Sequence, residues 1–432
     1  MSYTHPEDSN LKNLHKSMEY NGFGQPVLRV NATFGNNNGF NSSTTVDAFG
    51  RMRTSEPLTL FDCHFRYRDN TQKWNQVVTG TGDVQYLSNE SSMLLTTSDT
   101  GTVIRETKQV FSYQPGKSLL IMSTFAMNSP TAGVTQRVGY YGANDGVRFE
   151  AVGTVLRFVI RSSTSGNALD TEAVNQSNWN VDKLDGTGPS GITLDVTKTQ
   201  IFWCDIEWLG VGSVRCGFVV NGVFQVCHVF HHANLSNVVY TKTACLPLRY
   251  ELITVGTAAS MRQICSTVMS EGGYAPQSGT RSVSTSLTSP RAISNTALTP
   301  LISLRLKSGN LDAVVIPNSF SVYGLSQAAY RWALVLNPTL NAGTTTFTSA
   351  GTDSSVEYNI VATGFTGGTI LAEGIFVGDV KGGVVHINLD NFKSNFQLGR
   401  SIAGVSDIFC LAALATTVND QAVASMNWQE HT

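Results

Sequence analysis

The sequence is poor in charge and has no long apolar run. Only 14% of its 432 residues are charged, and 29 Lys and Arg against 31 Asp and Glu leave a net charge of -2. A dedicated nucleic-acid binder needs a basic face to neutralise phosphates, so this balance argues against one. No segment reaches the roughly 18 consecutive apolar residues that a membrane-spanning helix needs. The first residues show neither a basic nor an apolar stretch, which argues against a secretory signal.

Short metal-binding and nucleotide-binding motifs are also missing. No Cys-x2-Cys pair occurs among the seven cysteines, and strand alternation splits the cluster Cys227–His232 between two faces. The stretch GTGPSG at 186–191 has the letters of a dinucleotide-binding loop, but it contains a proline and follows no apolar strand. We therefore expect no metal ion, no cofactor, and reduced thiols in a protein made in a cytosol.

Ser, Thr, Asn and 39 glycines separate short runs of Val, Ile, Tyr and Phe. Asn221-Gly222 lies between two such runs and predicts a type I′ hairpin, because both central residues of that turn need a positive φ. A second hairpin is predicted around 144–146, and residues 154–161 are typical of a largely buried strand. No helical period persists beyond about three turns. We predict an all-β fold, with two β-sandwich or jelly-roll-like domains in tandem behind an extended N-terminal arm.

Composition sets the predicted domain boundaries. Residues 1–45 form the arm, 46–275 a β-sandwich of jelly-roll or lectin-like type, 276–300 a linker rich in Ser and Thr, and 301–432 a second β-sandwich. The linker is predicted because 11 of the 15 residues from 276 to 290 are Ser, Thr, Gly or Pro. An arm of this composition is expected to order only against another surface.

The best pair of carboxylates is Asp205 and Glu207, two positions apart in a predicted strand. Such residues point to one face about 7 Å apart, within the spacing of the acid and base of glycosidases. Laminarinase-type β-sandwich glycosidases carry Glu-x-Asp-x-x-Glu, whereas Trp203 stands here at the first position and no acidic residue stands at 208. A polysaccharide hydrolase built on this pair is one alternative function, and a solvent-facing acidic strand is the simpler interpretation.

Three aromatic residues, Tyr140, Tyr141 and Trp179, are candidates for a platform on which a sugar ring stacks. The same residue types serve more often in a core or an interface. A glycan-binding module that recognises host polysaccharide is therefore a second alternative function.

Three stretches resemble virion structural proteins of marine tailed bacteriophages, cyanophages especially. They are DAFGRMRTSEPLTLFD at 47–62, WNVDKLDG at 179–186 and QICSTVMSEGGY at 263–274. They span roughly half of the chain, and the C-terminal domain resembles the same proteins more diffusely. The resemblance implies a component of the tail, baseplate, fibre or head of a particle, made in the host cytoplasm, and it supplies no catalytic residues.

The main functional prediction is a non-enzymatic virion structural protein that binds other virion proteins. A homo-oligomer is expected, because the exposed edges of the sheets would then be covered by neighbouring subunits, and the resemblance favours a trimer. Contacts for assembly are expected from the arm and the segment that follows it, at Phe34, Phe40, Phe49, Arg51, Arg53 and Phe61.

Overall fold

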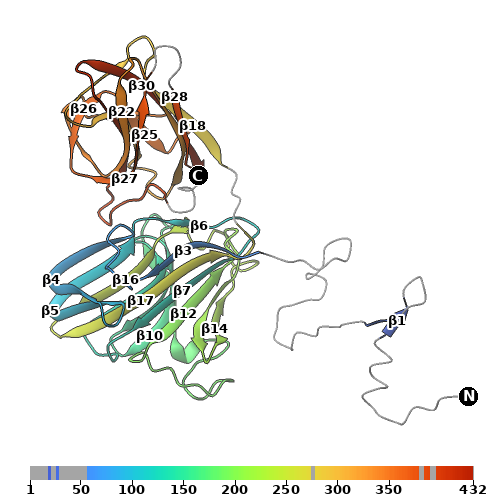
Figure 1. Cartoon of the computed structure of the whole chain (residues 1–432). Coiled ribbons are helices and arrows are strands. Elements are labelled where there is room, and N and C mark those ends of the chain that lie inside the picture. Colours follow the sequence, from blue (N-terminus) through green and yellow to red (C-terminus); the bar gives the residue numbers. More distant parts are fainter. Residues whose placement is uncertain are drawn as a thin grey trace, which may run out of the picture. The chain divides into compact units, whose positions relative to one another are not determined.

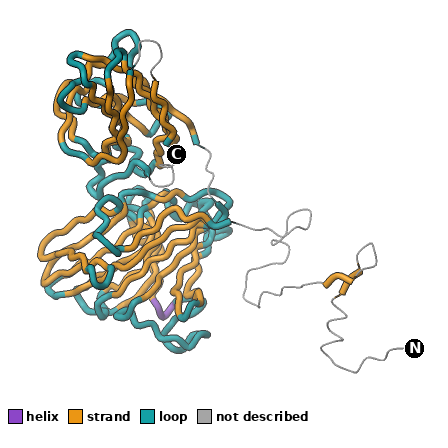
Figure 2. Tube along the Cα trace, in the orientation of Figure 1, coloured by secondary structure: helices purple, strands orange, loops and turns teal. Residues whose placement is uncertain are grey.

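The structure, a computed structural model, describes residues 56–273, 278–378, 384–389 and 396–431, and two paired strands, β1 (Met18–Tyr20) and β2 (Pro26–Leu28). The chain divides into the units 1–55 and 56–432, and the second unit is described below. Its described residues form strands and loops with one turn of 3-10 helix, η1 (Gln176–Asn178) (Figures 1 and 2). The predicted all-β class is thereby confirmed. In this part of the chain, no helix has the length and apolar character needed to cross a membrane.

Two large apolar cores lie within residues 56–432. The first gathers buried side chains between Phe61 and Val268, and the second gathers buried side chains between Ile293 and Trp428. Each core has its own set of strands, so two β regions follow one another along the chain. The boundaries proposed at 45, 275 and 300 stay predictions.

The first β region is a single antiparallel sheet of 13 strands, accompanied by the short pair β6 (Phe111–Ser112) and β15 (Cys245–Leu246). The strands of the sheet are β3 (Leu58–His64), β4 (Trp74–Leu87), β5 (Ser92–Thr107), β7 (Leu119–Ala126), β8 (Val134–Tyr141), β9 (Gly146–Val152), β10 (Val155–Ser162), β11 (Leu169–Asn175), β12 (Gln200–Ile206), β13 (Val214–Val220), β14 (Val223–Phe230), β16 (Leu248–Thr254) and β17 (Ala259–Ser270).

This sheet curls because β5 pairs with two strands in succession. Residues 101–106 of β5 pair with β16, and residues 93–97 pair with β17. One half of the sheet runs from β16 through β8, β9 and β10 to β11, and the other runs from β17 through β7, β12 and β13 to β14 (Figure 1). The two halves face each other across the first core, where rings from both halves meet: Phe149, Phe158, Phe202 and Phe218.

The hairpins form where the sequence predicts them. Asn221 and Gly222 have φ angles of 53° and 77° and join β13 to β14, as a type I′ turn requires. β8 and β9 pair around the turn at 142–145, and β10 begins at Val155. These three predictions are confirmed, since each depends on local turn chemistry and strand alternation.

The edge strands of the curled sheet, β11 and β14, are fastened to each other by the chain that follows η1. The backbone N–H groups of Val181 and Asp182 donate to the carbonyl of Cys227 on β14, at 3.0 and 3.1 Å. The Asn180 side chain donates to the Val229 carbonyl and accepts from the Val229 N–H, both at 2.9 Å. An unpaired edge invites pairing with another chain, so this segment covers the edge of β14.

Two histidines at this junction have opposite pKa shifts. Nδ1 of His228 accepts a hydrogen bond from the backbone N–H of Asn180 at 3.2 Å, and burial lowers the pKa of His228 to about 4. The ring nitrogens of His232 lie 3.1 Å from the Glu172 carboxylate on β11 and 2.7 Å from the Gly212 carbonyl. Burial acts to lower the pKa of His232, but these two partners together raise it. His228 therefore favours its neutral form and His232 its charged form.

The second β region has a five-stranded sheet, a six-stranded sheet and a two-stranded sheet. The five-stranded sheet contains β18 (Gly279–Ser284), β19 (Arg291–Ile293), β21 (Val314–Gly324), β28 (Val384–Asn388) and β30 (Asp420–His431). The six-stranded sheet contains β20 (Thr299–Leu306), β22 (Ala329–Leu336), β24 (Thr348–Ser349), β25 (Val356–Asn359), β27 (Thr369–Val377) and β29 (Ile408–Ala415), and in the two-stranded sheet β23 (Thr339–Gly343) pairs with β26 (Ala362–Thr366). β18 and β19 lie in the Ser/Thr-rich segment 276–300 and both pair with β30.

Charged side chains form a continuous ion-pair network on the face of the first sheet that points away from the core. It crosses five adjacent strands from β5 to β10, ends at β11, and includes one residue of the second β region. Its members are Glu106, Arg137, Arg148, Glu150, Arg157, Arg161, Asp170, Arg249, Glu251 and Arg400.

Glu150 lies at the centre of this network and is fully buried. Its carboxylate accepts hydrogen bonds from Nε of Arg137 and Nε of Arg148, each at 2.8 Å, and from Arg157. Burial acts to raise the pKa of Glu150, but Arg148 and Arg137 hold it below its ordinary value. The carboxylate is therefore charged at neutral pH, and it balances the positive charge of three arginines, Arg137, Arg148 and Arg157.

Replacing Glu150 tests that dependence. We expect Glu150→Ala to lower the free energy of unfolding by about 3–5 kcal/mol, because Arg148, only 1% exposed, then retains a single carboxylate partner, Asp170. Urea denaturation measures the loss. The control Glu373→Ala removes a half-exposed carboxylate from Arg331 and should cost at most about 1 kcal/mol. Equal losses in the two variants would contradict this account.

The two histidines predict opposite effects of pH on stability. The contribution of His232 is present below its unfolded pKa of 6.5 and is lost as pH rises through its higher folded pKa. The contribution of His228 is present above pH 6.5 and is lost as pH falls towards 4. We expect His232→Gln to destabilise more at pH 5.5 than at pH 8, and His228→Gln to flatten the acid limb of the stability profile. Urea midpoints across this pH range measure both, and parallel profiles for all three proteins would contradict the assignment.

Candidate functional site

Most of the residues predicted for assembly lie outside the described residues: Phe34, Phe40, Phe49, Arg51 and Arg53. The sixth, Phe61, is on β3 and is 4% exposed. Its ring packs against Trp74 and Phe111, with centroids 6.1 and 5.0 Å apart. Phe61 therefore belongs to the core of the first β region and offers no surface to a neighbouring subunit.

The structure corrects the predicted sugar platform. Tyr140, Tyr141 and Trp179 are 1%, 3% and 3% exposed, so none of them offers a face to a sugar ring. Trp179 stacks on Phe158 at 4.3 Å, in the segment that follows η1. The ring of Tyr141 lies beneath the guanidinium groups of the ion-pair network, including that of Arg249 at 5.5 Å. Tyrosine and tryptophan carry enough apolar surface to serve the interior, and here they do.

Asp205 and Glu207 have different surroundings. Asp205 is buried on β12 and binds the guanidinium of Arg215 on β13 through both carboxylate oxygens, one of them at 2.9 Å from Nε. Burial raises the pKa of Asp205, although Arg215 acts to lower it. Glu207 is exposed and lies beyond Ile206, where β12 ends. The pair therefore combines a buried, arginine-bound carboxylate with an exposed one.

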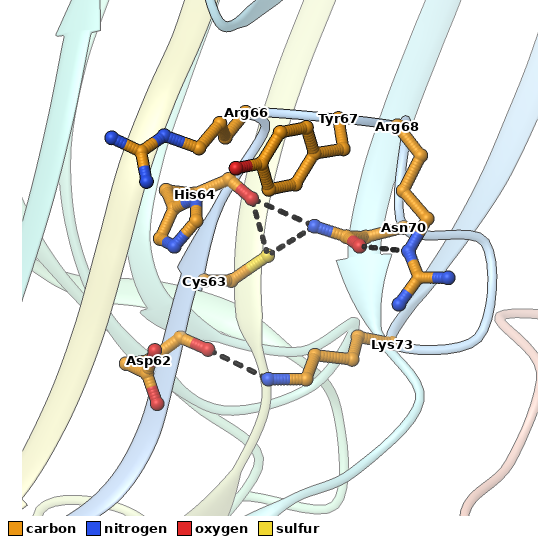
Figure 3. Close-up of a pocket in the computed structure, with 8 residues that line it drawn as sticks. All are labelled: Asp62, Cys63, His64, Arg66, Tyr67, Arg68, Asn70 and Lys73. Carbon is orange, nitrogen blue, oxygen red and sulfur yellow. Dashed lines mark hydrogen bonds between the residues drawn. The ribbon is translucent and has the colours of Figure 1, made fainter.

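A pocket of about 180 Å³ opens between the end of β3 and the start of β4 (Figure 3). The residues that line it are Asp62, Cys63, His64, Arg66, Tyr67, Arg68, Asn70 and Lys73. Most of them belong to the short loop that joins the two strands, and six of the eight have exposed side chains.

Tyr67 is the most exposed large apolar side chain of the described residues, at 81%. Figure 3 shows its ring at the rim of the pocket, between Arg66 and Arg68. The Arg66 guanidinium lies 5.7 Å from the centre of the ring. A large aromatic ring left in water costs free energy of solvation, which a stacked ligand would recover.

The floor of the pocket is held by hydrogen bonds to a buried sulfur. Sγ of Cys63 accepts from Nε1 of Trp74 at 3.1 Å and from Nδ2 of Asn70 at 3.2 Å. Nδ2 of Asn70 also donates to the carbonyl of His64 at 2.8 Å. Asn70 has a φ of 55°, which Asn adopts more readily than most residues, and this turns the chain towards β4. Burial raises the pKa of the Cys63 thiol, so it stays protonated and serves as an acceptor rather than a nucleophile.

A buried arginine supports the loop from below. Arg105 on β5 donates to the backbone carbonyl of Asp69 at 2.8 Å, and its other donors go to Gln76 and Gln263. Burial lowers the pKa of Arg105 to about 10, so it remains charged at neutral pH. Its guanidinium also lies 5.6 Å from the ring of Phe65, which is fully buried at the start of the loop. The loop is therefore fixed at both ends and at its middle.

The rim groups supply both kinds of hydrogen-bonding atom. Arg66, Arg68 and Lys73 are donors, and the exposed Asp62 carboxylate is an acceptor. Nζ of Lys73 is bound to the backbone carbonyl of Asp62 at 2.8 Å, which keeps the amine at the edge of the pocket. The arrangement combines an aromatic face with charged donors and one carboxylate, and it has no second acidic residue.

None of the candidate sites predicted from the sequence lies at this pocket. A signal was present in Arg66-Tyr67-Arg68, a basic and aromatic triplet followed directly by Asp69-Asn70, a typical turn pair. Strand alternation alone does not say that a loop residue stays exposed. In the described residues, no three His, Cys, Asp or Glu side chains converge to hold a metal ion.

No family model and no curated protein matches this chain. Solved structures match about half of it at low similarity. A Bacillus licheniformis β-glucanase is 13% identical over 50% of this chain and 98% of its own, with a TM-score of 0.32. A legume lectin-like domain from Entamoeba histolytica is 8% identical over 50% and 99%, with a TM-score of 0.32. The Emp47p carbohydrate recognition domain is 10% identical over 50% and 97%, again at 0.32. Similarity this low supports no inference about what this chain binds.

The hydrogen bonds to Cys63 can be tested by substitution. We expect Cys63→Ala to lower the free energy of unfolding by about 1–3 kcal/mol, because the buried Trp74 Nε1–H loses its acceptor. Cys63→Ser keeps an acceptor at this position and should lose less. Urea denaturation followed by tryptophan fluorescence measures both. Equal losses would show that the volume of the sulfur matters and its hydrogen bonds do not.

Proposed function

We propose that the first β region is a carbohydrate-binding module and that the pocket between β3 and β4 is its sugar-contact site. The observation that carries this proposal is Tyr67, an aromatic ring 81% exposed beside a pocket lined by hydrogen-bonding side chains. Binding sites for small ligands are concave and combine an apolar surface with a few fixed polar groups.

The chemistry of a sugar ring suits this combination. One face of a pyranose presents C–H groups that stack on an aromatic ring, and its hydroxyl groups both donate and accept hydrogen bonds. The pocket offers a ring in Tyr67, donors in Arg68 and Lys73, and an acceptor in Asp62. Each class of sugar group therefore has a partner within one pocket.

The rigidity of the loop supports the proposal. Arg105 fixes the backbone at Asp69, and Cys63 fixes the side chains of Asn70 and Trp74. A site held in place before the ligand arrives loses less conformational entropy on binding. The exposed ring is therefore presented from a braced loop.

We propose binding without cleavage. Asp62 is the one acidic residue among those that line the pocket, whereas hydrolysis of a glycosidic bond needs two carboxyl groups across the bond. Asp205 and Glu207 are not among the residues that line this pocket. A virion subunit could attach to a polysaccharide in this way. The assignment of this chain to a virion stays a prediction from the sequence resemblance.

Truncation of the exposed ring tests the proposal. We expect Tyr67→Ala to weaken binding to the recognised polysaccharide at least tenfold, about 1.4 kcal/mol, because the stacking surface is lost. A glycan array finds the ligand, and isothermal titration measures the change. The control Phe224→Ala removes an exposed aromatic ring on β14, outside the pocket, and should leave the affinity unchanged. No binding by the wild-type chain, or equal losses in both variants, would overturn the proposal.

A further inference from the structure

The positive charge of the pocket is not neutralised within the described chain. Among the residues that line the pocket, Arg66, Arg68 and Lys73 face a single carboxylate, that of Asp62, so its Arg, Lys and Asp side chains sum to a charge of +2. The whole chain, by contrast, carries a net charge of -2. The pocket is therefore a local excess of positive charge on a slightly acidic protein.

Most other arginines of the described residues already have a carboxylate partner. Ten of them form ion pairs: Arg137, Arg148, Arg157, Arg161, Arg215, Arg249, Arg262, Arg305, Arg331 and Arg400. Arg66 and Arg68 are not among them. Nε of Arg68 donates to the neutral amide oxygen of Asn70 at 3.2 Å, and Arg66 lies against the ring of Tyr67.

We infer that the sugar bound at this pocket carries an anionic group, a carboxylate or a sulfate ester; this inference rests on the proposed function. The planar guanidinium fork matches the two oxygens of such a group and forms charge-assisted hydrogen bonds with it. A sugar stacked on Tyr67 places its ring substituents beside Arg66 and Arg68, which flank the tyrosine (Figure 3). The ring of Tyr67 then supplies contact area, and the two arginines make the pocket selective for anionic sugars over neutral ones.

A single-stranded nucleic acid also combines flat rings with anionic groups, but the pocket favours a sugar. Proteins that bind single strands track the backbone along a basic groove with successive exposed aromatic rings. Here Tyr67 is the one Phe, Trp or Tyr residue among those that line the pocket, and the lining also includes the Asp62 carboxylate. The same carboxylate accepts hydrogen bonds from sugar hydroxyl groups.

The experiment measures binding of the full chain to three polysaccharides and one oligonucleotide. The polysaccharides are a uronate polymer, a sulfated galactan and a neutral glucan, and the oligonucleotide is single-stranded DNA. We expect the chain to prefer one of the two anionic polymers at least tenfold over the neutral one. Raising the salt concentration from about 50 to about 300 mM should weaken that binding several-fold, because exposed charges are screened.

Two double variants separate the pocket from the charge of the whole chain. Arg66→Gln with Arg68→Gln should weaken binding to the anionic polymer at least tenfold and weaken binding to the neutral glucan far less, because glutamine keeps a hydrogen-bond donor at each position and removes only the charge. Arg281→Gln with Lys198→Gln removes the same charge from exposed positions outside the pocket, and it should change binding to neither the anionic polymer nor the neutral glucan. Arg281 is a matched choice because it also has no carboxylate partner among the described residues, and it donates to the backbone carbonyl of Asp353.

The failures are distinguishable. Binding of the neutral glucan that depends on Tyr67 but not on salt or the arginines would overturn the charge inference and leave the proposed function standing. Equal losses in the two double variants would overturn the assignment of charge recognition to this pocket. Tighter binding to the oligonucleotide than to every polysaccharide would overturn the sugar as ligand. Binding to none of the four would remove the proposed function as well.

Discussion

A β-sheet has two edges whose amide and carbonyl groups seek partners, and the first β region depends on how it closes them. The sheet curls because β5 pairs first with β17 and then with β16, which brings the far edges, β11 and β14, to the same side of the core. The chain after η1 then fastens along β14 through Asn180 and its neighbours. The same segment carries Trp179 into the core, where it stacks on Phe158.

Burial of charge is the second constraint. The chain has few charged residues, and many of its arginines belong to the ion-pair network around Glu150. A buried carboxylate remains charged only when it is paired with a positive group. That network lies on the outer face of the strands from β5 to β11, and its central carboxylate, Glu150, is bound by three arginines. The loop between β3 and β4 is different, because Arg66 and Arg68 are exposed and form no ion pair with a carboxylate of the described residues. Charge that is not used in folding is available for a ligand.

Local features of the sequence predicted much of the fold. The Asn221-Gly222 turn, the hairpin before Gly146 and the strand from Val155 follow from turn chemistry and strand alternation, which act within a few residues. The exposure of the aromatic residues was harder to predict, because a tyrosine at a strand position is equally suited to a core and to a surface. Tyr140 points into the core, and Tyr141, on the opposite face, is covered by arginines from other strands.

The sequence by itself determined an all-β chain with two successive β regions, because composition, turn residues and alternation are properties of neighbouring residues. Only the tertiary structure decided which polar and aromatic groups are free. Asp205 is bound by Arg215 from the adjacent strand, and the loop that carries Tyr67 is braced by Arg105, 38 positions further along the chain than the tyrosine. Burial and ion pairing depend on partners brought together by strand pairing, so no local pattern reveals that Tyr67 stays exposed while Trp179 does not.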